Sequence, residues 1–277
     1  MKQTTPISSL ERPLFLTSFF SHEKPVWTLA DLARVSGLPK ASCLRALRAL
    51  ERFAVIQRFE GGYRLGTRLL ELGGIVQASY PARRVAMPFL EQLRDQTLQS
   101  TQWVIRDGNE GIYLDVFESR ARVRMYIAPG RRAPLYAGAS TRLILTFSDA
   151  HLKAEILGGA MRAYTEITPC APAELEALID LSARTWLAAS FGELEPHSAE
   201  IAAPVFGLGG EFVAAISLAG TAAVFADEAS LLGYLEAVSK TAEEVSRTLG
   251  YSGPWQTDPR RFLQEMPALS PDRGRAD

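Results

Sequence analysis

The stretch from Pro39 to Phe53 constrains the fold most, because its side chains separate onto two faces of a predicted helix. Side chains suited to a core recur at helical spacing, at Cys43, Ala46, Leu47, Leu50 and Ala54. Arg45, Arg48 and Arg52 form a basic stripe on the opposite side, which Ala41 and Ala49 keep narrow. Such a helix can pack on a core and press its other face against an anionic partner.

A shorter helix is predicted immediately upstream. Thr28-Leu-Ala-Asp31 matches a capping pattern that opens a helix, and Ser36-Gly37 ends it. Pro39 suits the first position of the next helix. Two helices joined by a tight turn that contains glycine are typical of a helix-turn-helix.

The flanking segments complete a small domain. A first helix is predicted over Ser9–Phe20, and two strands, Val55–Arg58 and Tyr63–Leu65, follow the basic helix. Gly61 and Gly62 favour the positive φ angles of a tight hairpin between the strands. These elements predict a winged helix-turn-helix domain over residues 9–66, in which Arg58 and Arg64 of the wing contact backbone phosphates.

The segment after the wing is predicted to be a linker helix over residues 67–80, and its apolar side chains make it a candidate dimer contact. Charge separates this part of the chain from the rest. The first 75 residues carry 11 Lys and Arg against 6 Asp and Glu, whereas the remainder carries 19 against 25. Three arginines alone fit a solvated face equally well, and the turn upstream and the hairpin downstream favour DNA.

Composition excludes several other classes. Of the 277 residues, 47% are hydrophobic and 22% charged, which is typical of a globular protein with more than one domain. No apolar run approaches the ~20 residues of a membrane span, and no secretory pattern opens the chain, so we expect a cytoplasmic protein without membrane contact. Cys43 and Cys170 are far apart, which argues against a disulfide framework or a zinc site.

From Pro81 the sequence alternates helices and strands. Helices are predicted over Val85–Leu98, Thr141–Phe147, Ala150–Leu157, Ala171–Ser182 and Asp227–Leu249. Strands are predicted over Thr101–Arg106, Gly111–Glu118, Val123–Ile127, Glu200–Phe206 and Phe212–Ala219, with a loop over Ala128–Leu135. Sequential hairpins with helices outside predict an antiparallel α+β domain over residues 81–250. Residues 251–277, which are rich in proline, are predicted to be largely irregular.

Residues that support catalysis are few. The histidines lack metal-ligand spacing, and no phosphate loop, nucleophile elbow or dinucleotide fingerprint occurs, so no catalytic residue, metal or cofactor is predicted. Glu193, Glu195 and His197 could be drawn as a metal or acid/base cluster, but their alternate positions favour a solvated face. The alternative to a DNA-binding protein is a small-molecule sensor or scaffold without DNA binding. An enzyme is the least favoured reading.

Six motifs occur in a characteristic order: Leu-Pro39-Lys-Ala-Ser-Cys-Leu-Arg45, Gly-Tyr63-Arg-Leu-Gly66, Arg-Met-Tyr126, Gly-Arg-Arg-Ala-Pro134-Leu, Glu193-Leu-Glu-Pro196 and Ile201-Ala-Ala-Pro-Val205. Together, over about Ser9 to Leu249, they resemble the IclR family of bacterial transcriptional regulators. The resemblance implies a winged-helix DNA-binding domain, a linker helix and a GAF-like domain that binds a small organic effector, in homodimers or homotetramers. It places recognition-helix contacts on Lys40, Ser42 and Arg45.

The sequence also departs from the family pattern in the sensor. Ser140-Thr141-Arg142 replaces the usual Leu-Gly-Lys, and Glu200 stands where cysteine is common. Ser190 and Phe191 stand where an aspartate pair is usual. Because of these differences, the identity of the effector is the property that can least be inferred from the family.

Position within the resembling domain gives the candidate effector-binding residues: Trp103, Arg106, Arg124, Met125, Ala139, Ser140, Phe191, Glu200 and Ser217. Such a pocket should be mostly apolar with a few convergent polar groups. The competing interpretations are core packing for Trp103 and Met125, and surface ion pairs for the two arginines. For Ser217 the competing interpretation is a hydroxyl satisfied by backbone.

Glu200 leaves three alternatives, because a buried and unpaired carboxylate is costly. It caps its strand in water, pairs with Arg106 or Arg124, or receives a cationic or hydroxylated ligand. In the last case the effector is not a simple carboxylate.

The sequence thus predicts a dimeric or tetrameric transcriptional regulator whose DNA binding responds to a small effector. Its recognition helices would enter successive major grooves of an inverted-repeat operator, with half-sites ~34 Å or a multiple apart. In this hypothesis Arg45 reads a base edge, whereas Arg48 and Arg52 mainly bind phosphate.

Overall fold

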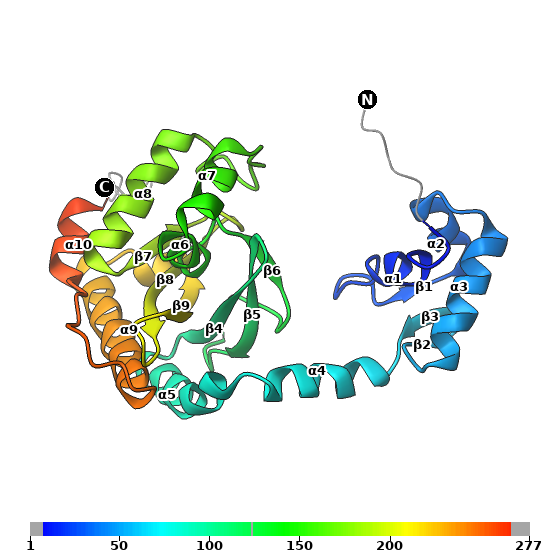
Figure 1. The fold of residues 1–277 in the computed structure, drawn as a ribbon, viewed down its shortest axis with the longest axis horizontal. Coiled ribbons are helices and arrows are strands. Elements are labelled where there is room, and N and C mark those ends of the chain that lie inside the picture. The colour runs from blue at the N-terminus through cyan, green and yellow to red at the C-terminus, as the bar shows by residue number, and fades with distance from the viewer. Residues whose placement is uncertain (1–7, 123, 267–277) are drawn as a thin grey trace. The chain divides into compact units, whose positions relative to one another are not determined.

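The computed structural model describes residues 8–122 and 124–266, and the chain divides into two compact units. The boundary lies between Tyr80 and Pro81, so the N-terminal unit is residues 1–80 and the C-terminal unit is residues 81–277 (Figure 1). Among the described residues, no helix has both the length and the apolar character needed to cross a bilayer.

The N-terminal unit combines short helices with a three-stranded antiparallel sheet of order β1-β3-β2. Its elements are α1 (Arg12–Thr17), β1 (Val26–Trp27), α2 (Leu29–Ser36), α3 (Lys40–Arg52), β2 (Ile56–Phe59), β3 (Gly62–Leu65) and α4 (Arg68–Ala78). This arrangement confirms the predicted winged helix-turn-helix. The first helix is shorter than the predicted Ser9–Phe20, and β1 was not predicted because two residues carry no recognisable alternation.

Local sequence signals set the two helices of the motif. The Thr28 hydroxyl accepts a hydrogen bond from the Asp31 N–H and caps α2, and Gly37 ends α2 with φ of +68°. Pro39 is the N-cap of α3 rather than its first helical residue. Ala54, predicted to face the core, is exposed and has φ of +55°, because α3 has already ended and the chain turns into the wing.

The predicted core face of α3 is otherwise confirmed. The buried apolar side chains of this unit are Leu16, Trp27, Leu32, Cys43, Ala46, Leu47, Leu50, Ile56 and Tyr63. The hairpin turn is formed by Glu60 and Gly61, which both have positive φ, rather than by Gly61 and Gly62. Gly62 belongs to β3, where a Cβ would lie 2.8 Å from the Trp27 carbonyl oxygen, so close strand approach explains this glycine.

The C-terminal unit is built on a six-stranded antiparallel sheet of order β6-β5-β4-β9-β8-β7. Its strands are β4 (Ser100–Asp107), β5 (Glu110–Phe117), β6 (Arg132–Pro134), β7 (Ala188–Phe191), β8 (Ser198–Phe206) and β9 (Phe212–Thr221). Its helices are α5 (Pro81–Thr97), α6 (Ala139–Thr146), α7 (Ala150–Gly158), α8 (Pro172–Thr185), the 3-10 turn η1 (Ala222–Phe225), α9 (Glu228–Thr248) and α10 (Pro259–Glu265). The predicted antiparallel α+β sheet domain is confirmed.

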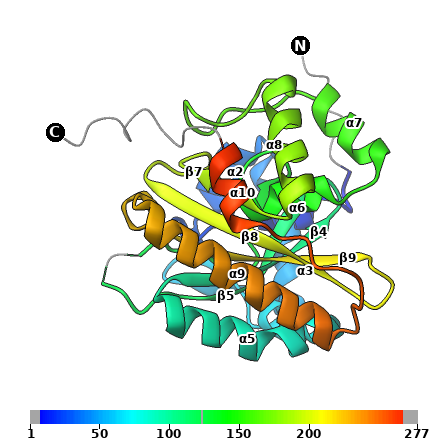
Figure 2. The same cartoon turned by 90° about the vertical axis from the view of Figure 1, so that its left-hand side faces the viewer.

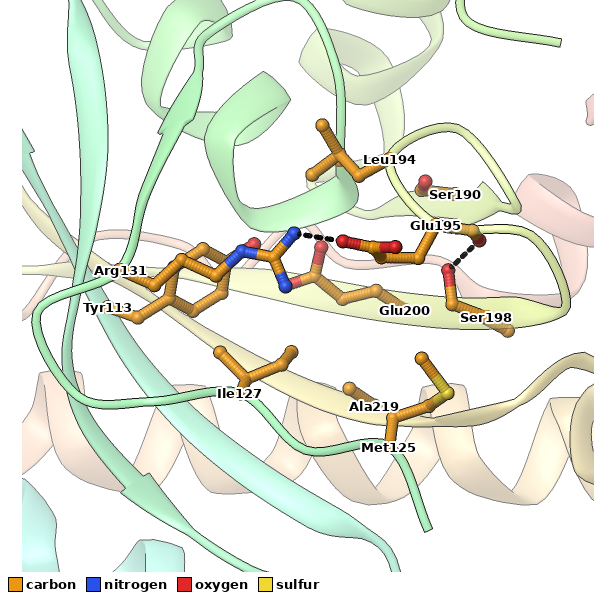
Figure 3. Close-up of a pocket in the computed structure, with 12 residues that line it drawn as sticks. Tyr113, Met125, Ile127, Arg131, Ser190, Leu194, Glu195, Ser198, Glu200 and Ala219 are labelled. Carbon is orange, nitrogen blue, oxygen red and sulfur yellow. Dashed lines mark hydrogen bonds and ion pairs between the residues drawn. The ribbon is translucent and has the colours of Figure 1, made fainter. Parts of the chain in front are cut away.

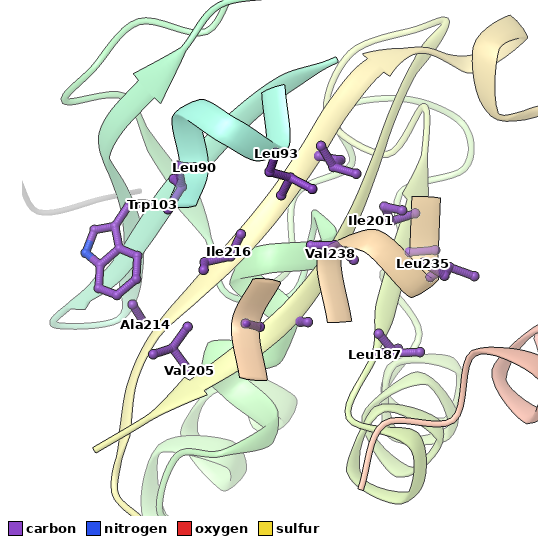
Figure 4. Close-up of a cluster of buried hydrophobic side chains, with 14 of the residues drawn as sticks. Leu90, Leu93, Trp103, Leu187, Ile201, Val205, Ala214, Ile216, Leu235 and Val238 are labelled. Carbon is purple, nitrogen blue, oxygen red and sulfur yellow. The ribbon is translucent and has the colours of Figure 1, made fainter. Parts of the chain in front are cut away.

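Helices cover both faces of this sheet. Figure 2 shows α5 and α9 lying across one face, and α6 packs on the other face against β8 and β9. The first face carries the larger core, in which Leu90 and Leu93 of α5 and Leu235 and Val238 of α9 meet the strands (Figure 4). Because side chains alternate along a strand, neighbouring residues of β8 and β9 serve different faces.

Three segments of this unit differ from the prediction. Val123 lies outside the described residues, and Arg124–Ile127 form no strand; instead β6 pairs with β5 within the predicted loop Ala128–Leu135. The Gly130 N–H donates to the Tyr113 carbonyl oxygen and the Tyr113 N–H to that of Arg131, which guides the chain back along β5. Strand β7 was not predicted, because four residues between a helix and a turn give a weak pattern.

Residues 251–266 are more ordered than predicted, and the rest of the predicted irregular segment, residues 267–277, lies outside the described residues. Helix α10 follows Asp258, whose carboxylate caps it by accepting from the Arg261 N–H. Phe262 is buried in the main core, and Trp255 packs on Trp186 with ring centroids 5.4 Å apart. Prolines remain compatible with this segment because Pro259 occupies the first turn of α10.

Candidate functional site

One candidate surface is the outer face of α3. Arg45, Arg48 and Arg52 are exposed on the side opposite the buried Cys43 and Leu47, and Lys40 is exposed at the start of the helix. Arg48 and Arg52 make no hydrogen bond or ion pair within the part of the chain that the structure describes. The predicted basic stripe therefore exists as an exposed set of cations.

Ser42 differs from its predicted place on this surface. It is only 9% exposed, and its hydroxyl accepts a hydrogen bond from Arg45 Nη2 at 3.3 Å. Ser42 is adjacent to the core residue Cys43, and the 100° rotation between them turns Ser42 only partly outward. It lies beside Arg45 rather than on the outer face.

The two wing arginines lie on opposite faces of the hairpin. Arg58 is paired with Tyr63 in the strand register and Arg64 with Gln57, so alternation separates them. Arg58 donates to Glu51 of α3 at 3.3 Å, whereas Arg64 lies over the Phe59 ring at 4.2 Å. Both remain exposed, but they present their charges in different directions.

The second candidate is a cavity of about 40 Å³ in the C-terminal unit (Figure 3). It is lined by Tyr113, Met125, Ile127, Arg131, Gly138, Ser190, Leu194, Glu195, Ser198, Ala199, Glu200 and Ala219. These residues come from β5, the loop before β6, the residue before α6, the loop between β7 and β8, and the strands β7, β8 and β9. The lining combines apolar side chains with the polar side chains of Arg131, Glu195 and Glu200.

Glu200 is buried between this cavity and the start of α6. Its Oε2 accepts the Ala139 N–H at 2.8 Å and the Ser140 N–H at 3.4 Å, and its Oε1 accepts the Ser140 hydroxyl at 2.7 Å. Burial raises the pKa of the Glu200 carboxyl, and the hydrogen bonds from the Ser140 hydroxyl and the two amides oppose that change. The solvent-exposed alternative for Glu200 is therefore wrong.

A second carboxylate binds the same helix end. The Gly138 N–H donates to Glu193 Oε2 at 2.9 Å, and Arg142 Nη2 donates to both oxygens of Glu193, 2.5 Å from Oε1. Arg142 is 1% exposed and also donates to the Ala189 carbonyl oxygen at 2.9 Å. Glu193 is thus part of a buried ion pair and not of the solvated face that the sequence favoured. Because Glu193 is paired with Arg142, its carboxylate is not available to the metal or acid/base cluster that could be drawn from Glu193, Glu195 and His197.

The mouth of the cavity carries a further ion pair, in which Arg131 Nη2 lies 2.7 Å from Glu195 Oε1. Tyr113 is buried beside Arg131, whose carbonyl oxygen accepts the Tyr113 N–H, and burial, together with the nearby Glu200 charge, raises the pKa of the Tyr113 phenol. Gly138 has φ of +97°, which L side chains rarely adopt, and a Cβ there would lie 2.9 Å from the Thr141 hydroxyl oxygen. The positive φ and this close contact favour glycine just before α6.

Some predicted effector residues do gather here. Met125 and Glu200 line the cavity, and Ala139 and Ser140 hold Glu200. Ser217 faces the same side of the sheet and is buried, and its hydroxyl donates to Gln102 at 2.6 Å rather than to backbone.

Other predicted residues lie elsewhere. Trp103 and Phe191 face the α5 and α9 side of the sheet, because each is one register position away from the cavity face. Arg106 hydrogen-bonds the Gly108 carbonyl oxygen, and Arg124 pairs with Glu118 at 3.3 Å. Neither arginine neutralises Glu200.

Sequence reasoning missed Tyr113, Arg131, Ser190, Glu195 and Ser198. Arg131 belongs to the motif Gly-Arg-Arg-Ala-Pro134, which carried the family resemblance but was not treated as part of the pocket. Ser190 was noted as a departure, and only the strand register of β7 places it rather than Phe191 on the cavity side. A predicted β7 would have supplied that signal.

Comparisons with known proteins agree with this architecture. Residues 9–58 match the IclR helix-turn-helix domain, and residues 76–247 match the C-terminal domain of the bacterial transcriptional regulator IclR. The chain is 36% identical over 249 residues to the HTH-type transcriptional regulator KipR of Bacillus subtilis, covering 87% of this chain and 96% of KipR. It is 31% identical over 251 residues to the regulator XynR of Escherichia coli, covering 88% and 98%.

A solved structure has the same fold. An IclR homologue from Microbacterium hydrocarbonoxydans in complex with 4-hydroxybenzoate gives a TM-score of 0.75 at 24% identity, covering 88% of this chain and 100% of that one. The matched proteins are named as transcriptional regulators rather than enzymes. This chain is accordingly a DNA-binding transcriptional regulator with an effector-binding C-terminal domain, and it belongs to the IclR family.

Proposed function

We propose that α3 is the recognition helix and enters the major groove of operator DNA. The observation that carries this proposal is the exposed basic face of α3, on which Arg48 and Arg52 have no partner within the described residues. Exposed cations of this kind neutralise phosphates, and a helix is the element that fits the major groove. Lys40 lies at the start of α3, where the helix would first meet the duplex.

Within this face, Arg45 reads a base edge and Arg48 and Arg52 bind phosphates. Ser42 orients Arg45 through the 3.3 Å hydrogen bond between its hydroxyl and Arg45 Nη2. Arg58 and Arg64 are further phosphate contacts, and their opposite faces make them contribute at different points of the backbone.

The functional species is a homodimer or homotetramer on an inverted repeat. Support comes from α4, which has no buried residue and exposes Leu70 at 79% and Ile75 at 64%. Isolated helices with exposed apolar side chains gain stability by pairing, and a two-fold pair matches a palindromic operator. Because its partner is chromosomal DNA, the protein acts in the cytoplasm.

The cavity around Glu200 is the effector site of a GAF-like sensor. Support comes from its buried polar groups and from the walls supplied by β5, α6, β7, β8 and β9. Effector binding changes the spacing of the two recognition helices, because a ligand shifts an equilibrium only between states for which its affinities differ. This switch has three parts: the DNA-binding domain at residues 9–66, the linker helix at residues 67–80, and the effector-binding domain at residues 81–250 with α10 added.

Fluorescence anisotropy with DNA from the intergenic region upstream of the gene tests the proposed function. Wild type should bind one site more tightly than random DNA of the same length, and Arg45→Ala should lose that preference. Arg34→Ala is a matched control, because Arg34 is an exposed arginine on α2 that pairs with Asp31. Equal binding to operator and random DNA by wild type would instead favour the sensor without specific DNA recognition.

A further inference from the structure

The start of α6 is an anion-binding position that the chain itself fills. Helix N-termini attract negative charge, because their first N–H groups have no partner within the helix. Here the Gly138 N–H donates to Glu193, and the Ala139 and Ser140 N–H groups donate to Glu200. The donors that would hold a ligand carboxylate are therefore engaged by two side-chain carboxylates.

Strand β8 holds Glu200 in this position. In the sheet register Glu200 lies opposite Ser190 of β7 and Ala219 of β9, and both of these residues also line the cavity. The Glu200 carboxylate consequently separates α6 from the cavity. A carboxylate accepts about four hydrogen bonds, and α6 supplies three of them, so one acceptor position remains for a ligand donor.

The charges around the cavity also disfavour an acid. The charged side chains that line it are the carboxylates Glu195 and Glu200 and the guanidinium Arg131. Arg131 is committed to Glu195 at 2.7 Å, and no arginine hydrogen-bonds Glu200 among the described residues. An incoming carboxylate would meet a surplus of negative charge in a buried place and find the N–H groups of Gly138, Ala139 and Ser140 already engaged.

We infer that Glu200 determines effector specificity: it occupies the anion-binding end of α6, so the cavity takes an effector bearing hydroxyl or amine donors and excludes small carboxylates. This inference rests on the proposed role of the cavity as the effector site. Glu200 excludes small carboxylates because it occupies the amide donors at the start of α6. The same Glu200 carboxylate accepts a hydrogen bond from the effector.

Calorimetric titration of full-length protein with matched probes tests the inference. The probes are lactate against propane-1,2-diol, and 4-hydroxybenzoate against 4-hydroxybenzyl alcohol, because each pair differs only in a carboxylate replaced by a CH₂OH group. Wild type should bind each alcohol at least about tenfold more tightly than its acid, since like charges brought together cost several kcal/mol.

Glu200→Ala frees the Ala139 and Ser140 N–H groups and should bind the acids at least about tenfold more tightly than wild type does. Glu200→Gln keeps the shape, removes the charge and should gain less. It carries the test if the alanine variant does not fold. Glu244→Gln is the control, because it removes an exposed carboxylate on α9 that does not line the cavity, and it should keep the wild-type preference.

Two results would overturn the inference. One is a wild type that binds an acid as tightly as its matched alcohol; the other is a failure of both Glu200 variants to bind the acids better than wild type. Operator binding by the same preparations is a separate readout. Its loss with intact probe selectivity would count against the proposed function alone.

Discussion

The two candidate sites handle charge in opposite ways. On α3, Arg48 and Arg52 are exposed and without partners within the described residues, so their charges are free for DNA. In the C-terminal unit, Arg142 is 1% exposed and bonded to Glu193, and Glu200 is bonded to the start of α6. Exposed charges cost folding little because water solvates them, whereas buried charges require fixed partners.

This difference separates recognition from sensing. The α3 face meets a long polyanion and needs no preformed acceptor. The cavity meets a small molecule, and its buried charges fix which chemical groups can enter. Substitutions on α3 should therefore change binding more than stability, and substitutions at the buried charges should change stability first.

The largest effect concerns the end of the C-terminal unit, whose α10 buries Phe262. Truncation after Gly250 should lower the free energy of unfolding of this unit by more than about 3–5 kcal/mol, the usual cost of losing one buried phenylalanine. Truncation after Met266, which keeps α10, is the matched reference. Urea unfolding followed by tryptophan fluorescence measures both, and equal stability of the two truncated chains would show that α10 is dispensable.

Arg142→Met should cost about 3–5 kcal/mol of stability, because it leaves Glu193 buried without its cation. Arg48→Met is the matched exposed arginine and should change stability by no more than about 0.5 kcal/mol. Denaturant melts of the two variants compare the sites directly. Similar losses of stability in the two variants would contradict the distinction between exposed, unpaired charges and buried, paired charges.

Arg45→Ala should weaken operator binding by about 1–3 kcal/mol and relax discrimination at one base pair. The physical reason is the loss of a directed contact with a base edge. Binding titrations against operators mutated at single positions identify that base pair. An unchanged ratio of operator to random DNA affinity would remove Arg45 from base readout.

Arg48→Ala and Arg52→Ala should weaken binding to all sequences alike. Each should reduce the slope of log K against log salt by roughly one, because one fewer phosphate is neutralised. Titrations between low and moderate salt measure the slope, with Arg34→Ala as the exposed arginine outside α3. A slope equal to that of wild type would place these arginines away from the backbone.

A further effect is a pH dependence at Glu200. Burial raises its folded pKa above the ordinary value of 4.5, so the folded state holds its proton more tightly than the unfolded state. The resulting stabilisation is fully present below pH 4.5 and is lost as pH rises through the raised pKa. The stability of wild type relative to Glu200→Gln should therefore fall as pH increases from about 4.5, and denaturant melts across that range measure it.

Much of the N-terminal unit could be predicted because its signals are local. Thr28 caps the helix that it precedes, Gly37 ends that helix, and the two faces of α3 follow from a 3.6-residue period. Each signal acts within a few residues, so it does not depend on the tertiary structure. The role of Gly62 could not be predicted from the wing alone, because it depends on the close approach of β1, an element from earlier in the chain.

The cavity depended on long-range geometry. Its family position located Glu200, Met125 and the start of α6, but the sequence could not say that Ala139 and Glu200, 61 residues apart, share a hydrogen bond. Nor could it choose Ser190 over Phe191, since a shift of one residue in strand register exchanges the two faces of a sheet. Arg131 reaches the cavity because the chain turns back along β5 at Gly130, whereas Arg106 and Arg124 are held by nearer partners.

By itself, the sequence determined the winged helix-turn-helix, the basic face of α3 and the antiparallel sheet, because repeating patterns and caps encode elements locally. Only the tertiary structure decided which side chains converge on the cavity and that Glu200 fills the end of α6. Convergence depends on strand register and on loop paths between distant segments, and neither leaves a periodic trace in the chain.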